Sequence, residues 1–154
     1  MTAIKTPLIR FSFLFIVSLC LTLVSHTAWA ETVSVTKDGV NIRIGPSTDS
    51  AVYMEVFQGY PLKVLNKKGK WLKVTDFEGD TGWIYASLVK PGNTVIVNSQ
   101  STINMRSGPS TGNNIIANVE RGVVLTRLSK KGKWVKVKHS RGTVGWVYQP
   151  LLWP

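Results

Sequence analysis

The chain has 154 residues and a formal net charge of +11 at pH 7. This length suits one ordinary domain or two very small ones, and it excludes a doubly wound nucleotide-binding enzyme or an α/β barrel, which need about 200 residues or more. The 13 glycines and 7 prolines favour a turn-rich β protein, and the six tryptophans supply rings for small cores or binding faces.

The first thirty residues predict a secretory signal peptide that is cleaved after Ala30. Lys5 and Arg10 precede an apolar run from Phe11 to Val24, and an Ala-Trp-Ala sequence follows at 28–30. The alternative is an uncleaved membrane anchor, but a helix of fourteen residues reaches only about 21 Å, less than a ~30 Å hydrocarbon core. We therefore expect a periplasmic or secreted protein with no transmembrane span after cleavage.

Cleavage would leave Glu31–Pro154, with 17 basic and 8 acidic residues, a net charge of +9. Cys20 is the only cysteine in the chain, so the mature part has no disulfide, thiolate nucleophile or cysteine metal site. His139 is its only histidine, and no cysteine or second histidine accompanies it. We expect no catalytic residue, no metal site and no cofactor.

The mature chain repeats itself with an offset of 63 residues. Val40–Val89 aligns without a gap on Ile103–Leu152, and 22 of these 50 positions are identical. An exact period of this kind indicates a duplicated unit of about 60 residues. The sequence Lys-Pro-Gly-Asn-Thr at 90–94 is typical of a loop between two units. We therefore expect units at 31–90 and 95–154 with a linker at 91–94.

Within each unit the apolar residues alternate with a period of two. Met54 and Val56 in the first unit follow this pattern, as do Val135 and Val137 in the second, and glycine-containing turns separate the segments. No stretch after Ala30 keeps a helical period for three turns. The pattern predicts an all-β chain made of two tandem small, strongly bent β-barrels.

Both units contain the same ordered motifs: Asn-x-Arg-x-Gly-Pro-Ser-Thr, then Gly-x-Trp-x-Lys-Val, then Gly-Trp-[Ile/Val]-Tyr-x-x-Leu. This order closely resembles the bacterial SH3-like domain, and the resemblance covers nearly the whole mature chain twice. It implies tandem SH3-like barrels of five or six strands, usually exported. It also implies binding modules that often hold envelope proteins or wall hydrolases on peptidoglycan.

Two of the repeated motifs have a structural interpretation. The first is the arginine and Gly-Pro turn, in which the arginine either bonds several loop carbonyls or clamps a ligand carboxylate. The second is the Gly-Trp pair, which we interpret as close backbone packing beside a large ring. The residues are Arg43, Gly45, Pro46, Gly82 and Trp83, and in the second unit Arg106, Gly108, Pro109, Gly145 and Trp146.

Aromatic and basic residues give the candidate binding surface. Trp71 and Trp134 have the opposite parity to the alternating apolar residues, so each ring either forms an exposed platform or closes the barrel mouth. The candidate ligand-binding residues are Trp71, Tyr85, Trp134, Tyr148, Arg127, Lys136, Lys138 and Arg141.

Charge divides the two units. Residues 31–92 carry 8 basic and 7 acidic side chains, whereas residues 93–154 carry 9 basic and 1 acidic side chain. Asp76, Glu78 and Asp80 of the first unit correspond to His139, Arg141 and Thr143 of the second. A net +8 on 62 residues favours a polyanionic partner over a merely solvated face.

These observations favour an exported, non-enzymatic module that binds peptidoglycan or another anionic envelope polymer. The alternative is an envelope adaptor that recognises a protein partner through a peptide groove. Nucleic acid also suits a basic and aromatic face, but the export signal disfavours it. The carboxylates at 76–80 resemble a hairpin turn more than a calcium or glycosidase site.

Overall fold

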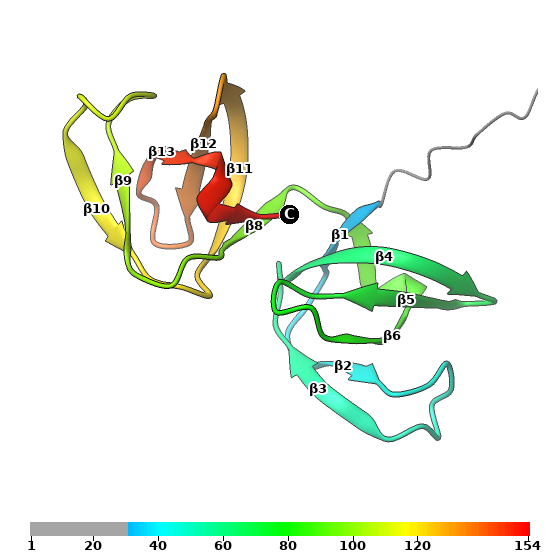
Figure 1. Ribbon diagram of the computed structural model, residues 1–154. Helices are drawn as coiled ribbons and strands as arrows, with labels where there is room; N and C mark the ends of the chain where they lie inside the picture. The colour runs from blue at the N-terminus through cyan, green and yellow to red at the C-terminus, as the bar shows by residue number, and fades with distance from the viewer. Residues whose placement is uncertain (1–30) are drawn as a thin grey trace, which may run out of the picture.

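The computed structural model describes residues 31–154 and consists of β-strands with two short 3-10 turns (Figure 1). The expected signal peptide and Cys20 lie outside the described residues. Within residues 31–154, no helix combines the length and the apolar character needed to cross a bilayer. The strands form two sheets of seven strands each, which confirms the predicted all-β tandem.

The first sheet has the strand order β3-β2-β6-β5-β4-β1-β7, and all the pairings in it are antiparallel. Its strands are β1 Thr32–Val35, β2 Val40–Arg43, β3 Val52–Val56, β4 Pro61–Lys68, β5 Trp71–Thr75, β6 Thr81–Tyr85 and β7 Val89–Pro91, with the 3-10 turn η1 at Ala86–Leu88. The resemblance implied five or six strands, and the additional pairing comes from the short segment β7, which adds to β1.

The second sheet has the equivalent order β10-β9-β13-β12-β11-β8-β14. Its strands are β8 Thr94–Val97, β9 Ile103–Arg106, β10 Ile115–Val119, β11 Val124–Lys131, β12 Trp134–His139, β13 Val144–Tyr148 and β14 Leu152–Trp153, with η2 at Gln149–Leu151. Pro91 ends β7 and Thr94 begins β8, so only Gly92 and Asn93 lie between the sheets. The division at 31–90 and 95–154 into independently folding units stays a prediction.

Bulges and glycine turns bend the two sheets at equivalent places. The register shifts between Val64 and Asn66 in β4, and between Arg127 and Ser129 in β11, which is the same position in each unit. A bulge of this kind increases local twist and curves a long strand. Gly69 and Gly132 turn the following hairpins with φ of +59° and +57°, a region that disfavours side chains.

Each unit has its own hydrophobic core. The first includes Val35, Leu62 and Ile84, and the second includes Met105, Leu125 and Val147, all fully buried. In β3 the predicted alternation of Val52, Met54 and Val56 on the core face holds at Met54 and Val56, but it is wrong at Val52, which is 48% exposed. The reason is an irregularity in the pairing of β2 with β3 between Ile42 and Arg43, beyond which Val52 leaves the core face.

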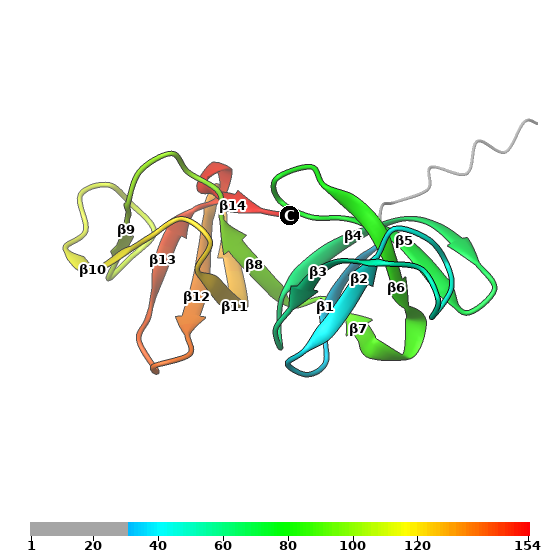
Figure 2. The ribbon, with the colours of Figure 1, turned by 90° about the horizontal axis from the view of Figure 1, so that it is seen from below.

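Specific contacts connect the two units, which lie side by side in Figure 2. Ile96 of β8 is 1% exposed and belongs to the core of the first unit, and Trp153 packs against the same core. The Thr94 hydroxyl donates a hydrogen bond to the Gly59 carbonyl at 2.6 Å, and Lys63 Nζ lies 5.2 Å from the centre of the Trp153 ring. The joint is therefore packed as well as covalently linked.

Close packing around Gly145 gives the first prediction. A Cβ atom at this position would lie 2.9 Å from the Arg106 carbonyl oxygen and 2.5 Å from Met105 Cγ. Backbone cannot move away cheaply, so Gly145→Ala should lower the free energy of unfolding by about 1–3 kcal/mol in chemical denaturation. Gly112→Ala is the control, because its nearest neighbour would be 3.7 Å away. Equal stability of the two variants would contradict the prediction.

The second prediction concerns Tyr60, whose hydroxyl donates to Asp76 Oδ2 at 3.3 Å. Burial first, and then the Asp76 carboxylate, raise the pKa of the Tyr60 phenol above its ordinary value. The folded state therefore holds the phenol proton more tightly than the unfolded chain, whose phenol titrates near pH 10. Stability from this group is present below about pH 10 and is lost as the pH rises further.

Denaturation of wild type and Tyr60→Phe from pH 8 to pH 11.5 tests this expectation. The stability of the wild type should fall more steeply above about pH 10 than that of the variant. At pH 7 the variant should be less stable by about 0.5–1.5 kcal/mol, because it lacks the hydrogen bond to Asp76. Parallel pH curves would show that the phenol has no raised pKa.

Candidate functional site

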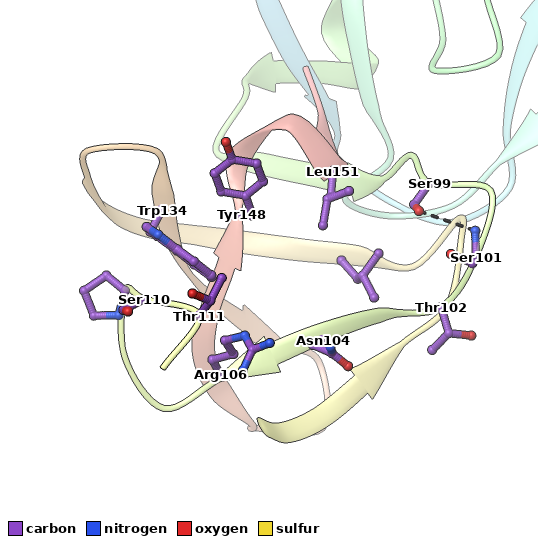
Figure 3. Close-up of a pocket in the computed structure, with 12 residues that line it drawn as sticks. Ser99, Ser101, Thr102, Asn104, Arg106, Ser110, Thr111, Trp134, Tyr148 and Leu151 are labelled. Atoms are coloured by element: carbon purple, nitrogen blue, oxygen red, sulfur yellow. Dashed lines mark hydrogen bonds between the residues drawn. The ribbon is translucent and has the colours of Figure 1, made fainter. Parts of the chain in front are cut away.

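The second unit contains a groove of about 600 Å³ between β9, the loop that follows it, and the ends of β12 and β13 (Figure 3). Tyr148 and Leu151 lie across this groove from Asn104 and Arg106, and Trp134 lies beside Tyr148 (Figure 3). We call it the second aromatic groove. Its remaining lining residues are Ser99, Ser101, Thr102, Ile103, Pro109, Ser110 and Thr111.

The first unit has an equivalent groove of about 420 Å³, the first aromatic groove. Eight of its nine lining residues have their counterpart, 63 positions later, in the second aromatic groove. These eight are Gly39, Val40, Asn41, Arg43, Thr48, Trp71, Tyr85 and Leu88. The duplication therefore repeats a surface hollow in addition to the fold.

A cross-strand aromatic pair forms one wall of each groove. Trp71 of β5 lies opposite Tyr85 of β6, with ring centroids 5.4 Å apart and planes at 85°. Trp134 and Tyr148 repeat this arrangement at 5.6 Å and 58°. All four residues are half-buried, so the rings are neither sealed in the cores nor fully exposed. Parity explains this, because Val135 beside Trp134 faces the core.

The repeated arginines hold the loops that form the opposite wall. Arg43 Nη1 donates to the Ser50 carbonyl at 2.7 Å, and Arg106 Nη1 donates to the Asn113 carbonyl at 2.8 Å. Both side chains also line their grooves. A guanidinium carries five N–H donors, so this loop contact leaves donors for a second partner. The two interpretations of the arginine are therefore compatible with each other.

The Gly-Pro turns lie in the same loops. A Cβ atom on Gly45 would approach Ser50 Oγ to 2.7 Å, and one on Gly108 would approach Asn113 Oδ1 to 2.5 Å. The glycines allow the loop to close on itself at these points. Pro109 lines the second aromatic groove, whereas Pro46 is not among the residues that line the first.

The Gly-Trp pairs join the arginine strand to the aromatic strand. Trp83 of β6 lies opposite Arg43 of β2, and Trp146 of β13 lies opposite Arg106 of β9. The preceding glycines, Gly82 and Gly145, are buried against β2 and β9. This close approach brings the arginine loop beside the aromatic pair.

The structure separates the predicted basic residues from the aromatic grooves. Lys136 lies opposite Trp146, and Arg127 donates through Nη2 to the Pro154 carbonyl oxygen at 3.2 Å. Lys138 and Arg141 lie at the turn end of the β12–β13 hairpin, away from the Trp134–Tyr148 pair. None of these four basic residues lines either groove.

Several groove residues were missed by sequence reasoning. Asn41 and Asn104 line the two grooves, as do Thr48 and Thr111. Their identity in both repeats was a visible signal in the sequence, but it carried no information on whether their side chains face a groove. Leu151 was not among the candidate ligand-binding residues, yet it lines the second aromatic groove while it packs against the core of the second unit.

The carboxylates at 76–80 form a turn. Asp76 is buried, and its Oδ1 accepts hydrogen bonds from the backbone N–H groups of Glu78 at 3.0 Å and Asp80 at 2.9 Å. Among residues 31–154, no group of three or more acidic, histidine or cysteine side chains is arranged to hold a metal ion.

The arginine contact gives a prediction for loop stability. Arg106→Ala removes the hydrogen bond to Asn113, and a bond from a charged donor contributes about 1.5–3 kcal/mol. We expect the free energy of unfolding, measured by chemical denaturation, to fall by that amount, and the amides of the loop 107–114 to exchange faster. Arg141→Ala is the control, because Arg141 is exposed and its side chain forms no hydrogen bond to any residue of 31–154. Unchanged exchange in Arg106→Ala would contradict the assigned role.

Comparison with known proteins gives one curated relative and several solved structures. The chain is 25% identical over 133 residues to YrvJ of Bacillus subtilis (strain 168), which is described as a candidate N-acetylmuramoyl-L-alanine amidase. This match covers 80% of the chain but only 26% of the relative, so the chain spans about a quarter of that protein's length.

Among solved structures, NlpC1 and NlpC2 from Trichomonas vaginalis each have a TM-score of 0.35 and 18% identity to the chain. They cover 80% of it, and the chain covers 45% and 48% of them. An NlpC/P60 family protein from Bacillus cereus ATCC 10987 has a TM-score of 0.36 and 14% identity, with 79% of the chain and 55% of that protein covered.

The family comparison matches the chain twice. The model of the bacterial SH3 domain matches residues 36–91 and again residues 99–154. These two segments contain all the lining residues of both aromatic grooves, with their arginine loops and aromatic pairs. The chain belongs to the bacterial SH3 domain family, as a tandem pair.

Proposed function

We propose that this protein is an exported, non-enzymatic module that binds peptidoglycan through its two aromatic grooves. The observation that carries the proposal is the repetition of one set of side chains in both grooves. Each groove presents a tryptophan–tyrosine pair facing an arginine and an asparagine. Membership of the bacterial SH3 family, in which cell-wall binding is common, supports the same function.

The groove chemistry matches the two components of peptidoglycan. Aromatic faces pack against the apolar faces of sugar rings and of short peptide side chains. The stem peptides present carboxylates and amides, which the free N–H groups of Arg106 and the amide of Asn104 can bind. Leu151 adds apolar surface to the same groove.

Because the two aromatic grooves are on one chain, each can bind the polymer weakly and both can bind it together. When two sites on one chain reach the same polymer, the second binding event occurs at a high effective concentration. The packed joint between the units limits the loss of freedom in that second event. We expect modest affinity for a single groove and clearly tighter binding by the pair.

The proposal also includes the location of the protein and the enzymes beside which it acts. The leader directs the chain to the periplasm or the exterior, where peptidoglycan is accessible. The resemblance to part of a protein described as a candidate N-acetylmuramoyl-L-alanine amidase is compatible with a targeting role beside a wall hydrolase. A wall-targeting module needs no catalytic residues of its own.

Cosedimentation with purified sacculi at low salt tests the proposal. Trp134→Ala/Tyr148→Ala should weaken binding about tenfold, because it removes one aromatic wall, and the same change at Trp71 and Tyr85 should have a similar effect. The variant with all four changes should lose binding almost completely. Tyr53→Ala is the matched control, because Tyr53 is an exposed aromatic residue outside both grooves.

The outcome separates wall binding from the adaptor alternative. Sacculus binding that is unchanged in the four-residue variant would overturn the assignment of the grooves. No sacculus binding by the wild type, together with stoichiometric capture of one envelope protein that the groove variants abolish, would favour peptide recognition instead.

A further inference from the structure

A second type of hollow lies where the two units meet. It has a volume of about 650 Å³ and is lined by residues of both sheets, including Gly59 and Lys90 from the first unit and Thr126 from the second. Lys90 and Lys138 contribute positive charges to it, His139 contributes an imidazole, and its lining contains no aspartate or glutamate. A hollow with this composition attracts anions.

A neighbouring hollow of about 400 Å³ extends this region along the second unit. Val123 and His139 line both hollows, so the two are adjacent. The second one adds Arg141, while Glu120 is the only acidic residue in its lining. We call the two together the basic groove.

The first unit has no open hollow at the position equivalent to the part of the basic groove that lies in the second unit. Ile42, Met54, Asp76 and Asp80 line the corresponding position there, and no space remains for a molecule as large as water. In the second unit, alanine replaces methionine at 117 and valine replaces tyrosine at 123. Smaller side chains therefore accompany the opening of this end of the second barrel.

The charge of the side chains at this hairpin turn also differs in sign between the two units. In the first unit, Asp76 accepts the turn hydrogen bonds; in the second, His139 Nδ1 accepts the Arg141 backbone N–H at 3.1 Å. Glu78 corresponds to Arg141. The smaller side chains at 117 and 123 and the replacement of Asp76 and Glu78 by His139 and Arg141 thus occur around one hollow, and this combination suits an anionic ligand.

The basic groove is separate from the aromatic groove of the same unit. Trp134 lies opposite Tyr148 at one end of the β12–β13 pair, and Lys138 lies opposite Val144 at the other end. At about 3.4 Å per residue, four residues along the strand separate these ends by about 14 Å. One side chain cannot serve both places.

Contacts between the units keep the basic groove formed. The Ser34 and Thr94 hydroxyls lie 2.6 Å apart, and both residues line the groove. Arg121 forms an ion pair with Glu78 at 3.3 Å and lies over the ring of Phe77, with 5.0 Å from its Cζ to the ring centroid. These contacts hold Lys90 of the first unit facing the same hollow as Lys138 of the second.

We propose that the basic groove is a second binding site, which takes a chain bearing phosphate or carboxylate groups. Arginine binds such oxygens with two parallel N–H bonds, and lysine binds them as a point charge. The length of the groove and its several cations suit successive anionic groups along a polymer better than one isolated ion. This site acts independently of peptidoglycan binding in the aromatic grooves.

The test is titration of the purified protein with a short inorganic polyphosphate and, in a separate arm, with poly-glutamate. Lys138→Gln/Arg141→Gln should weaken binding at least fivefold at low salt. Lys130→Gln/Lys131→Gln is the matched control: it removes the same charge from the same unit, at residues that line no part of the groove, and should weaken binding less than twofold. Lys90→Gln should weaken binding more than Lys68→Gln, because only Lys90 lines the groove.

The outcomes distinguish this site from a general electrostatic field and from the proposed function. Retained polyanion binding in Trp134→Ala, with amide shifts centred on residues 138–143, supports a separate site. Binding in only one arm identifies phosphate or carboxylate as the group recognised. Equal losses in the two double variants, or no saturable binding of either probe by the wild type, would overturn the proposal.

Discussion

The contact between a glycine and the backbone of a neighbouring strand holds each aromatic groove together. Gly82 allows β6 to approach β2, and Gly145 allows β13 to approach β9, at distances that leave no space for a Cβ atom. The strand on one side of this contact carries the arginine that fixes the loop, and the strand on the other side ends in the groove tyrosine. A side chain at either glycine would therefore separate the two walls as well as disturb the core.

The duplicated units conserve one surface and differ in another. Their aromatic grooves share eight lining positions. Around the turn end of the β12–β13 hairpin, the second unit has smaller side chains and more positive charge than the first unit has at the equivalent place. The two ends of the β12–β13 hairpin therefore differ: the end at Trp134 and Tyr148 carries residues that the first unit repeats, and the end at Lys138 and Val144 carries residues that differ from those of the first unit.

The joint between the units packs the two small barrels against each other. Ile96 completes the core of the first unit although it belongs to a strand of the second sheet, and Trp153 packs against that same core. Small barrels bury limited apolar area, so sharing a core residue stabilises both. It also fixes the relative direction of the grooves, which matters for a polymer that contacts more than one of them.

The amino-acid sequence was sufficient to predict the all-β class, the duplication and the hairpin glycines, and to name the four aromatic residues as candidates, but not their pairing across strands. Each depends on local patterns: the period of two, the 63-residue offset, and residues that favour turns. The sequence also identified Arg43 and Arg106, because a repeated arginine before a Gly-Pro turn has few structural interpretations. The tertiary fold places Asn104, Thr111 and Leu151 in the second aromatic groove and leaves Lys138 and Arg141 outside it, which the sequence pattern did not show. These facts depend on how bulged strands curve and how the two units pack, and long-range packing leaves no periodic mark in the chain.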